Sequence, residues 1–167
     1  MCSATRSTPP ERQPERRRDP AVVVATVFGV GYFPGAPGTF GAVVGLVVAV
    51  LLRLAKLHVV IEAAVLVGLL LIAVLVTGRA SRRFGRPDPP QIILDELVSV
   101  PVAFFLVPFV WHWYAVGFVL LRAFDILKPP PVRQLQRLPG GWGIVGDDGA
   151  AAVAANVVVQ ILMRVVF

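Results

Sequence analysis

One stretch of this chain limits its fold more than any other. Residues 59–76 are apolar throughout except for Glu62, and an apolar run of this length forms a helix that can cross the hydrocarbon core of a bilayer. Further apolar stretches occupy residues 40–52, 97–121 and 149–167. Because 56% of the 167 residues are hydrophobic, a soluble domain of this size could not bury its apolar surface. The sequence therefore predicts an all-α integral membrane protein, a helical bundle with polar junctions.

The chain divides into a short tail and one membrane domain. Residues 1–20 are rich in Arg and Pro and lack apolar periodicity, so we expect a disordered basic tail followed by a single domain over residues 21–167. The apolar segment after the tail is short and broken by Gly and Pro, which favours a cytoplasmic tail over a cleaved signal. The only cysteine, Cys2, excludes an internal disulfide and a Cys-based metal site.

The net charge of +6 indicates anchoring at a membrane surface. Basic residues flank the apolar stretches, as they do on the cytoplasmic side of membrane proteins. The sequence lacks the interleaved basic and aromatic residues that are typical of nucleic-acid binding. We therefore expect a multi-pass protein with the tail and the basic junctions in the cytoplasm, and no nucleic-acid partner.

The apolar stretch 97–121 can be traced in two ways. As one helix it would be about 37 Å long and could cross the membrane. As two half-helices it would turn near Pro108, beside a group of aromatic residues, and return to the side on which it began. We favour this re-entrant hairpin because the junction after it is basic. Only the hairpin brings Asp95 and Asp125 to the same face.

Acidic side chains gather at the junctions. Outside the tail, six of seven carboxylates lie between apolar stretches and only Glu62 lies elsewhere. Acids at the edge of a bilayer are costly unless they are paired, hydrated or bound to a metal. Mg²⁺ is the expected occupant, because it prefers oxygen ligands. The six are Asp88, Asp95, Glu96, Asp125, Asp147 and Asp148.

A glycine-rich loop at residues 29–41 precedes the first long apolar stretch. Its five Gly and two Pro disfavour a regular helix, and Thr39 is a good N-cap for the helix that follows. The free amides around Pro37, Gly38 and Thr39 could bind an anion such as phosphate. The alternative is a turn that only leads into a membrane helix, since the loop lacks the Lys of a P-loop.

Two acidic pairs each precede an apolar stretch. Asp95 and Glu96 come directly before residues 97–121, and Asp147 and Asp148 lie in a Gly-flanked turn ahead of the last helix. Each pair can bind a metal. Each can instead cap the helix that follows, because acids stabilise a helix N-terminus.

A third motif combines an acid with two cations. Arg122, Asp125 and Lys128 are spaced i, i+3, i+6, so they lie within one arc of a helix that ends at the prolines from Pro129. This arrangement offers one metal ligand between two cations that can neutralise phosphate. A surface ladder of ion pairs is the alternative.

Four segments carry a family resemblance: GVGYFPGAPGTFG, PPQIILDE, LLRAFDILKPPP and GGWGIVGDD. In this order and spacing they resemble the phosphatidylglycerophosphatase A family, over about residues 25–155. The FD-x-x-KP-x-P block and the PGT loop are the most specific parts. The chain departs from the family pattern at Val98 and Ser99, where Gly is usual, and at Gly149, where a bulkier residue is usual.

The resemblance implies an enzyme of the bacterial inner membrane whose active site faces the cytoplasm. Family members remove the terminal phosphate of phosphatidylglycerophosphate and leave phosphatidylglycerol, with Mg²⁺ as cofactor. The catalytic residues it implies are Asp95, Glu96, Asp125 and Lys128. The implied phosphate-binding residues are Gly38, Thr39, Arg122 and Lys128. The implied metal ligands are Asp95, Glu96, Asp125, Asp147 and Asp148.

Three questions stay open on the residues alone. Water is the first choice of nucleophile, but an aspartyl-phosphate intermediate would suit the same carboxylates. A small transporter would instead use Glu62 and the polar stripe Asn156, Gln160 and Arg164 on the last helix, and a non-catalytic scaffold would use the acids only as caps. The polar stripe also allows a homo-oligomer.

Overall fold

The computed structural model describes residues 19–130 and 132–166. Of the tail expected at residues 1–20, only Asp19 and Pro20 lie within the described residues. Pro20 begins the helix α2 (Pro20–Ala25), and Asp19 is its N-cap, since the Asp19 side chain accepts a hydrogen bond of 3.0 Å from the Ala21 amide. The regular elements of the described residues are all helices, as predicted.

Three of the described helices are long and apolar enough to cross a membrane, namely α3, α4 and α8. The short helix α5 cannot do so, since its ten residues extend only about 15 Å. In chain order the elements are α2 (Pro20–Ala25), the 3-10 helix η1 (Val30–Tyr32), α3 (Pro37–Leu54), α4 (Val59–Phe84), α5 (Leu94–Ala103), α6 (Trp111–Leu127), α7 (Val132–Leu135) and α8 (Gly141–Val166).

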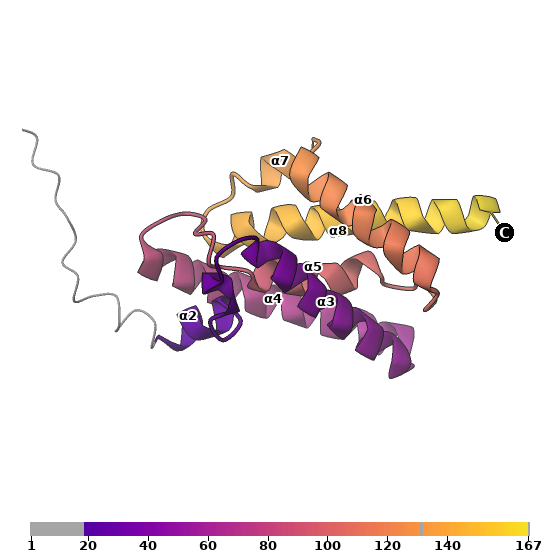
Figure 1. Ribbon diagram of the computed structural model, residues 1–167, viewed down its shortest axis with the longest axis horizontal. Coiled ribbons are helices and arrows are strands. Elements are labelled where there is room, and N and C mark those ends of the chain that lie inside the picture. Colours follow the sequence, from indigo (N-terminus) through magenta and orange to yellow (C-terminus); the bar gives the residue numbers. More distant parts are fainter. Residues whose placement is uncertain (1–18, 131, 167) are drawn as a thin grey trace, which may run out of the picture.

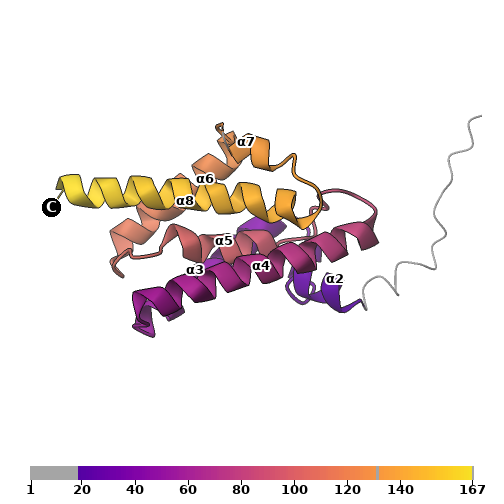
Figure 2. The same ribbon diagram turned by 180° about the vertical axis from the view of Figure 1, so that it is seen from behind.

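The short helix α5 lies at the centre of the bundle. Figure 1 shows α3 and α6 in front of it, and the opposite view in Figure 2 shows α4 and α8 on its other side. Each of these four helices contacts α5. The largest hydrophobic core cluster includes Val100, Ala103 and Phe104 from this segment. Helix α5 is therefore enclosed by the surrounding helices, and Asp95 at its start is buried as well.

The stretch 97–121 is a hairpin, as favoured from the sequence. α5 ends at Ala103, and α6 returns antiparallel from Trp111. The break leaves backbone carbonyls inside the bundle, where they need donors. The Asn156 side chain donates to the carbonyls of Ala103 at 3.0 Å and Phe105 at 2.8 Å, and Gln160 donates to Phe105 at 3.4 Å. Two members of the polar stripe on α8 thus stabilise the turn.

Two helix starts differ from the sequence predictions. α3 begins at Pro37 with Ala36 as its N-cap, so the prediction of Thr39 as N-cap was wrong. Proline is suited to the first turn of a helix, because its fixed φ and missing N–H cost nothing there.

The last helix starts at Gly141 rather than after the second acidic pair. A Cβ on Gly141 would lie 1.9 Å from the Val74 carbonyl oxygen, so its glycine allows α8 to pack closely on α4. The predicted turn at Asp147 and Asp148 was therefore wrong, because these residues lie inside α8. The glycines that suggested a turn, Gly146 and Gly149, are ordinary positions within this helix, where an added Cβ would lie 3.8 Å from Leu135 and 3.9 Å from Leu70.

Candidate functional site

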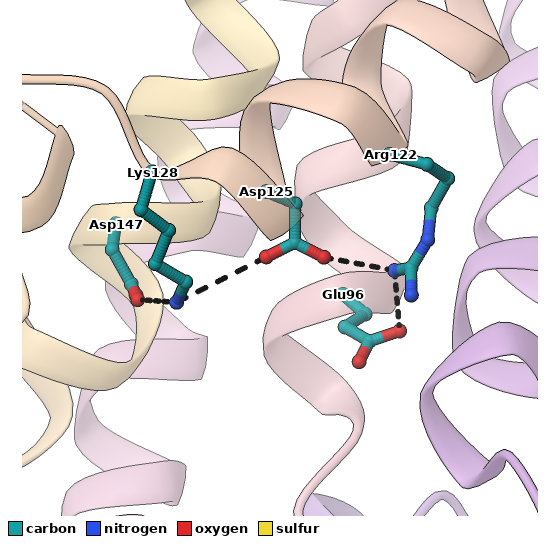
Figure 3. A network of polar contacts seen from close by, with 5 residues as sticks. All are labelled: Glu96, Arg122, Asp125, Lys128 and Asp147. Carbon is teal, nitrogen blue, oxygen red and sulfur yellow. Dashed lines mark hydrogen bonds and ion pairs between the residues drawn. The ribbon is translucent and has the colours of Figure 1, made fainter.

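Five charged side chains form one network at one end of the bundle (Figure 3). Asp125 lies at its centre, and Arg122 links it to Glu96, at 3.0 Å from Asp125 and 3.3 Å from Glu96. Lys128 continues the network, since its ammonium group lies 3.9 Å from Asp125 and contacts Asp147. Carboxylates and cations therefore alternate along it.

The hairpin and the start of α8 bring these residues together from distant parts of the chain. Glu96 lies in the first turn of α5, and Arg122 and Asp125 lie in the last turns of α6. Asp147 lies two turns into α8. Lys128 is the C-cap of α6 and has a left-handed backbone with φ of 41°, a conformation that is unfavourable for a residue with a Cβ. Such strain is typical of functional sites.

Three of the predicted acids are almost fully buried. Asp95, Asp147 and Asp148 are 7%, 4% and 9% exposed. In the described part of the chain, the Oδ1 atoms of Asp95 and Asp147 have no hydrogen-bond partner. Burial raises the pKa of Asp95 well above its ordinary value, and the nearby charges of Glu96 and Asp88 raise it further. These oxygens are costly to bury without a cation or a donor.

The pKa values of two further groups in the network also depart from their ordinary values. Burial raises the pKa of Glu96 above its ordinary value, although the Arg122 charge acts in the opposite direction. Burial acts to lower the pKa of Lys128, but the hydrogen bond to Asp147 and the surrounding carboxylate charges outweigh it, so this pKa is raised. Lys128 is therefore firmly held in its cationic form.

The glycine-rich loop contributes less than the sequence suggested. Gly38 lies against Glu96, since a Cβ there would lie 1.9 Å from Glu96 Oε1. Pro37 has no N–H, and the Thr39 amide donates to the Ala36 carbonyl at 3.0 Å. The Thr39 side chain is exposed. Of the predicted loop residues, the structure thus brings Gly38 to the network and leaves Thr39 at the surface.

Sequence reasoning missed Ser99 and left Asp88 without a role. Ser99 lines a small cavity together with Glu96, Arg122, Asp125 and Asp148. Its spacing of three residues from Glu96 places both on one face of α5, which is the signal that could have found it. Asp88 lies near enough to Asp95 for their charges to interact.

The carboxylate oxygens of the site suit a hard cation, although these side chains do not form a compact metal site in the structure. Within residues 19–130 and 132–166, no three His, Cys, Asp or Glu side chains converge as a metal-binding group. The unpartnered buried oxygens of Asp95 and Asp147 are nevertheless the kind of ligand that Mg²⁺ prefers. The residues present therefore fit such an ion.

Fold and site together define a helical membrane protein with an acid-and-cation site of the kind that handles phosphate esters. Residues 23–163 match the phosphatidylglycerophosphatase A family. The chain belongs to this family, as its motifs predicted.

Individual relatives agree over most of their length. The phosphatidylglycerophosphatase A of Haemophilus influenzae is 35% identical over 143 residues, 84% of this chain and 87% of the relative. That of Escherichia coli is 31% identical over 137 residues, 81% and 78% of the two chains. A Bacteroides thetaiotaomicron protein described provisionally as a phosphatidylinositol-3-phosphatase is 32% identical over 150 residues, 87% and 94% of the two chains. No solved structure matches the chain.

Proposed function

We propose that this protein hydrolyses the terminal phosphate of phosphatidylglycerophosphate and releases phosphatidylglycerol and inorganic phosphate. Family membership supports the reaction. The observation that carries it in this chain is the network in which Arg122 and Lys128 stand among carboxylates at one end of the apolar helices. A lipid whose acyl chains lie in the bilayer would present its head group at this level.

The two cations are proposed to bind the phosphate dianion. Arg122 offers a planar group that can donate two hydrogen bonds to phosphate oxygens, while Lys128 supplies a compact charge. Both are now bound to carboxylates, so an arriving phosphate would compete with Glu96 and Asp147 for them. The exchange would free carboxylate oxygens at the moment when the substrate binds.

The ligands of Mg²⁺ are proposed to come from Asp95, Glu96, Asp125, Asp147 and Asp148, with one of these carboxylates left free as the general base. The unpartnered oxygens of Asp95 and Asp147 support this assignment. When bound, the ion would neutralise charge on the phosphate group. A carboxylate of the network that does not bind the ion would accept the proton from the attacking group.

We infer that the site faces the cytoplasm of a bacterial cell. The end of α4 nearest to α2 carries Arg79, Arg82 and Arg83, and Lys128 follows α6. Basic residues concentrate on the cytoplasmic side of membrane proteins, and the relatives named above are bacterial.

The test is phosphate release by the detergent-purified protein from phosphatidylglycerophosphate, phosphatidylinositol 3-phosphate and phosphatidic acid, each with Mg²⁺ or with excess EDTA. We expect release from phosphatidylglycerophosphate to be fastest and to stop in EDTA. The name of the Bacteroides relative makes the inositol lipid the proper competitor. Faster release from the inositol lipid would make that lipid the substrate in place of phosphatidylglycerophosphate. Full activity in EDTA would contradict the proposed role of Mg²⁺.

A further inference from the structure

Ser99 is a buried hydroxyl that the roles proposed above do not use. It lies in α5 and is 2% exposed, and its Oγ atom has no hydrogen-bond partner among the described residues. A buried hydroxyl without a partner is unfavourable and calls for an explanation. Its surroundings indicate what the partner is.

Ser99 lines a small cavity beside the network. The polar part of the lining consists of Ser99, Glu96, Arg122, Asp125 and Asp148, and the apolar part consists of Ala42, Val100 and Leu121. The centre of a water molecule can move within about 10 Å³ of this cavity. This space suits roughly one bound water, which needs two to four polar partners. A phosphorylated lipid head group is far larger.

The position of the cavity suits an attacking water. Ser99 follows Glu96 by three residues, so it lies on the same face of α5 and about 4.5 Å deeper in the bundle. Arg122, which we assign to the phosphate, forms another wall. A water held here would therefore lie next to the phosphate group.

We propose that this cavity holds the water that attacks phosphorus and that Ser99 is its positioning residue; the inference rests on the proposed function. The Ser99 hydroxyl holds the water by one hydrogen bond, and a carboxylate of the lining holds it by another. The water oxygen forms the new P–O bond while one of its protons passes to that carboxylate. The bond between phosphorus and the glycerol oxygen breaks, and that oxygen leaves with the electron pair and takes up a proton.

The first test compares three serine variants for hydrolysis of phosphatidylglycerophosphate. Ser99→Ala is expected to lower kcat about tenfold, equivalent to about 1.4 kcal/mol, with KM unchanged, and Ser99→Thr is expected to restore much of the loss. Ser81→Ala is the matched control, because Ser81 is also buried but donates to the Arg86 carbonyl at 2.7 Å. It should lower stability and leave kcat unchanged.

The second test gives the site a larger nucleophile. In added methanol, the unmodified protein is expected to form mainly inorganic phosphate, whereas Ser99→Ala, with its wider cavity, should form a several-fold larger share of methyl phosphate. A raised KM with normal kcat, an unchanged product ratio or a phosphorylated Ser99 would overturn the inference. An unmodified protein that releases no phosphate would overturn the proposed function as well.

Discussion

At the scale of single residues, Arg122 is the cation that links α5 to α6 within the network. It contacts Glu96 from α5 and Asp125 from its own helix, so it fixes the position of two carboxylates and has a planar group suited to phosphate. Lys128 contacts the other end of the network. Arg122 and Lys128 therefore contact different parts of the network. Substituting one of them should change activity differently from substituting the other.

Arg122→Gln is expected to lower kcat/KM about 100-fold, because removal of a charged group that stabilises developing charge typically costs this much. Arg122→Lys keeps the charge but loses the planar donor pair, so its loss should be smaller, about tenfold. The measurement is phosphate release at varied substrate concentration. The control is Arg133→Gln, an exposed position on α7. Equal losses of kcat/KM at the two positions would contradict the role of Arg122.

Gly38→Ala is expected to lower activity with little effect on folding. The added Cβ would meet the end of the Glu96 side chain, which can turn away without moving the backbone but then leaves Arg122. Gly68→Ala is the control, because nothing lies within 4 Å of a Cβ there. Activity and thermal unfolding in detergent would be measured together. Unchanged activity of Gly38→Ala would show that the position of Glu96 is unimportant.

At the scale of secondary-structure elements, the α5–α6 hairpin is what makes one site out of separate motifs. α5 begins with the first acidic pair and α6 ends with Arg122 and Asp125. A single crossing through residues 97–121 would have separated them. The hairpin is stable inside the bundle because α8 supplies the donors for its turn.

Asn156→Leu is expected to destabilise the protein by about 2 kcal/mol, because the Ala103 carbonyl would lose its donor and the Phe105 carbonyl would keep only the longer hydrogen bond from Gln160. Thermal unfolding in detergent measures this change. Arg164→Gln changes the exposed member of the same stripe and should have no effect. A stripe that served transport would instead give two stable variants with impaired cation movement.

The sequence could predict the apolar helices, the hairpin and the gathering of the acids, because these follow from hydropathy and from the spacing of charges. It could not predict that Gly141 starts a helix or that Asp147 lies within one. Gly146 and Gly149 flank the acidic pair as they would in a turn, but both lie within α8, because tertiary packing can override the local preference of glycine. Ser99 was missed for a similar reason, since its burial and its cavity depend on three other helices.

At the scale of the whole molecule, the charged pairs inside the bundle lie in two groups at its opposite ends. The network lies where α3, α5 and α8 begin and where α6 ends. Glu62 is also buried, but it lies one turn into α4 and pairs with Arg53 at 3.5 Å, near the end of α3. The bundle therefore has a catalytic candidate at one end and a structural ion pair at the other.

The orientation of these ends can be measured by labelling single cysteines in a Cys2→Ser background. If the site end faces the cytoplasm, as we infer, Gln136→Cys in the exposed segment before α8 should react with a membrane-impermeant maleimide only after the cells are opened. Ala55→Cys, in the exposed link between α3 and α4, should react in intact cells. The reverse pattern would place the site on the outer face.

We propose that the network around Asp125, and not the Arg53–Glu62 ion pair, carries catalysis. The most direct test measures phosphate release from phosphatidylglycerophosphate by Asp125→Asn beside Glu62→Gln, each an isosteric removal of one negative charge. We predict that Asp125→Asn loses at least about 100-fold in kcat, while Glu62→Gln retains activity with reduced stability. Normal turnover by Asp125→Asn, or equal losses in the two folded variants, would contradict the account.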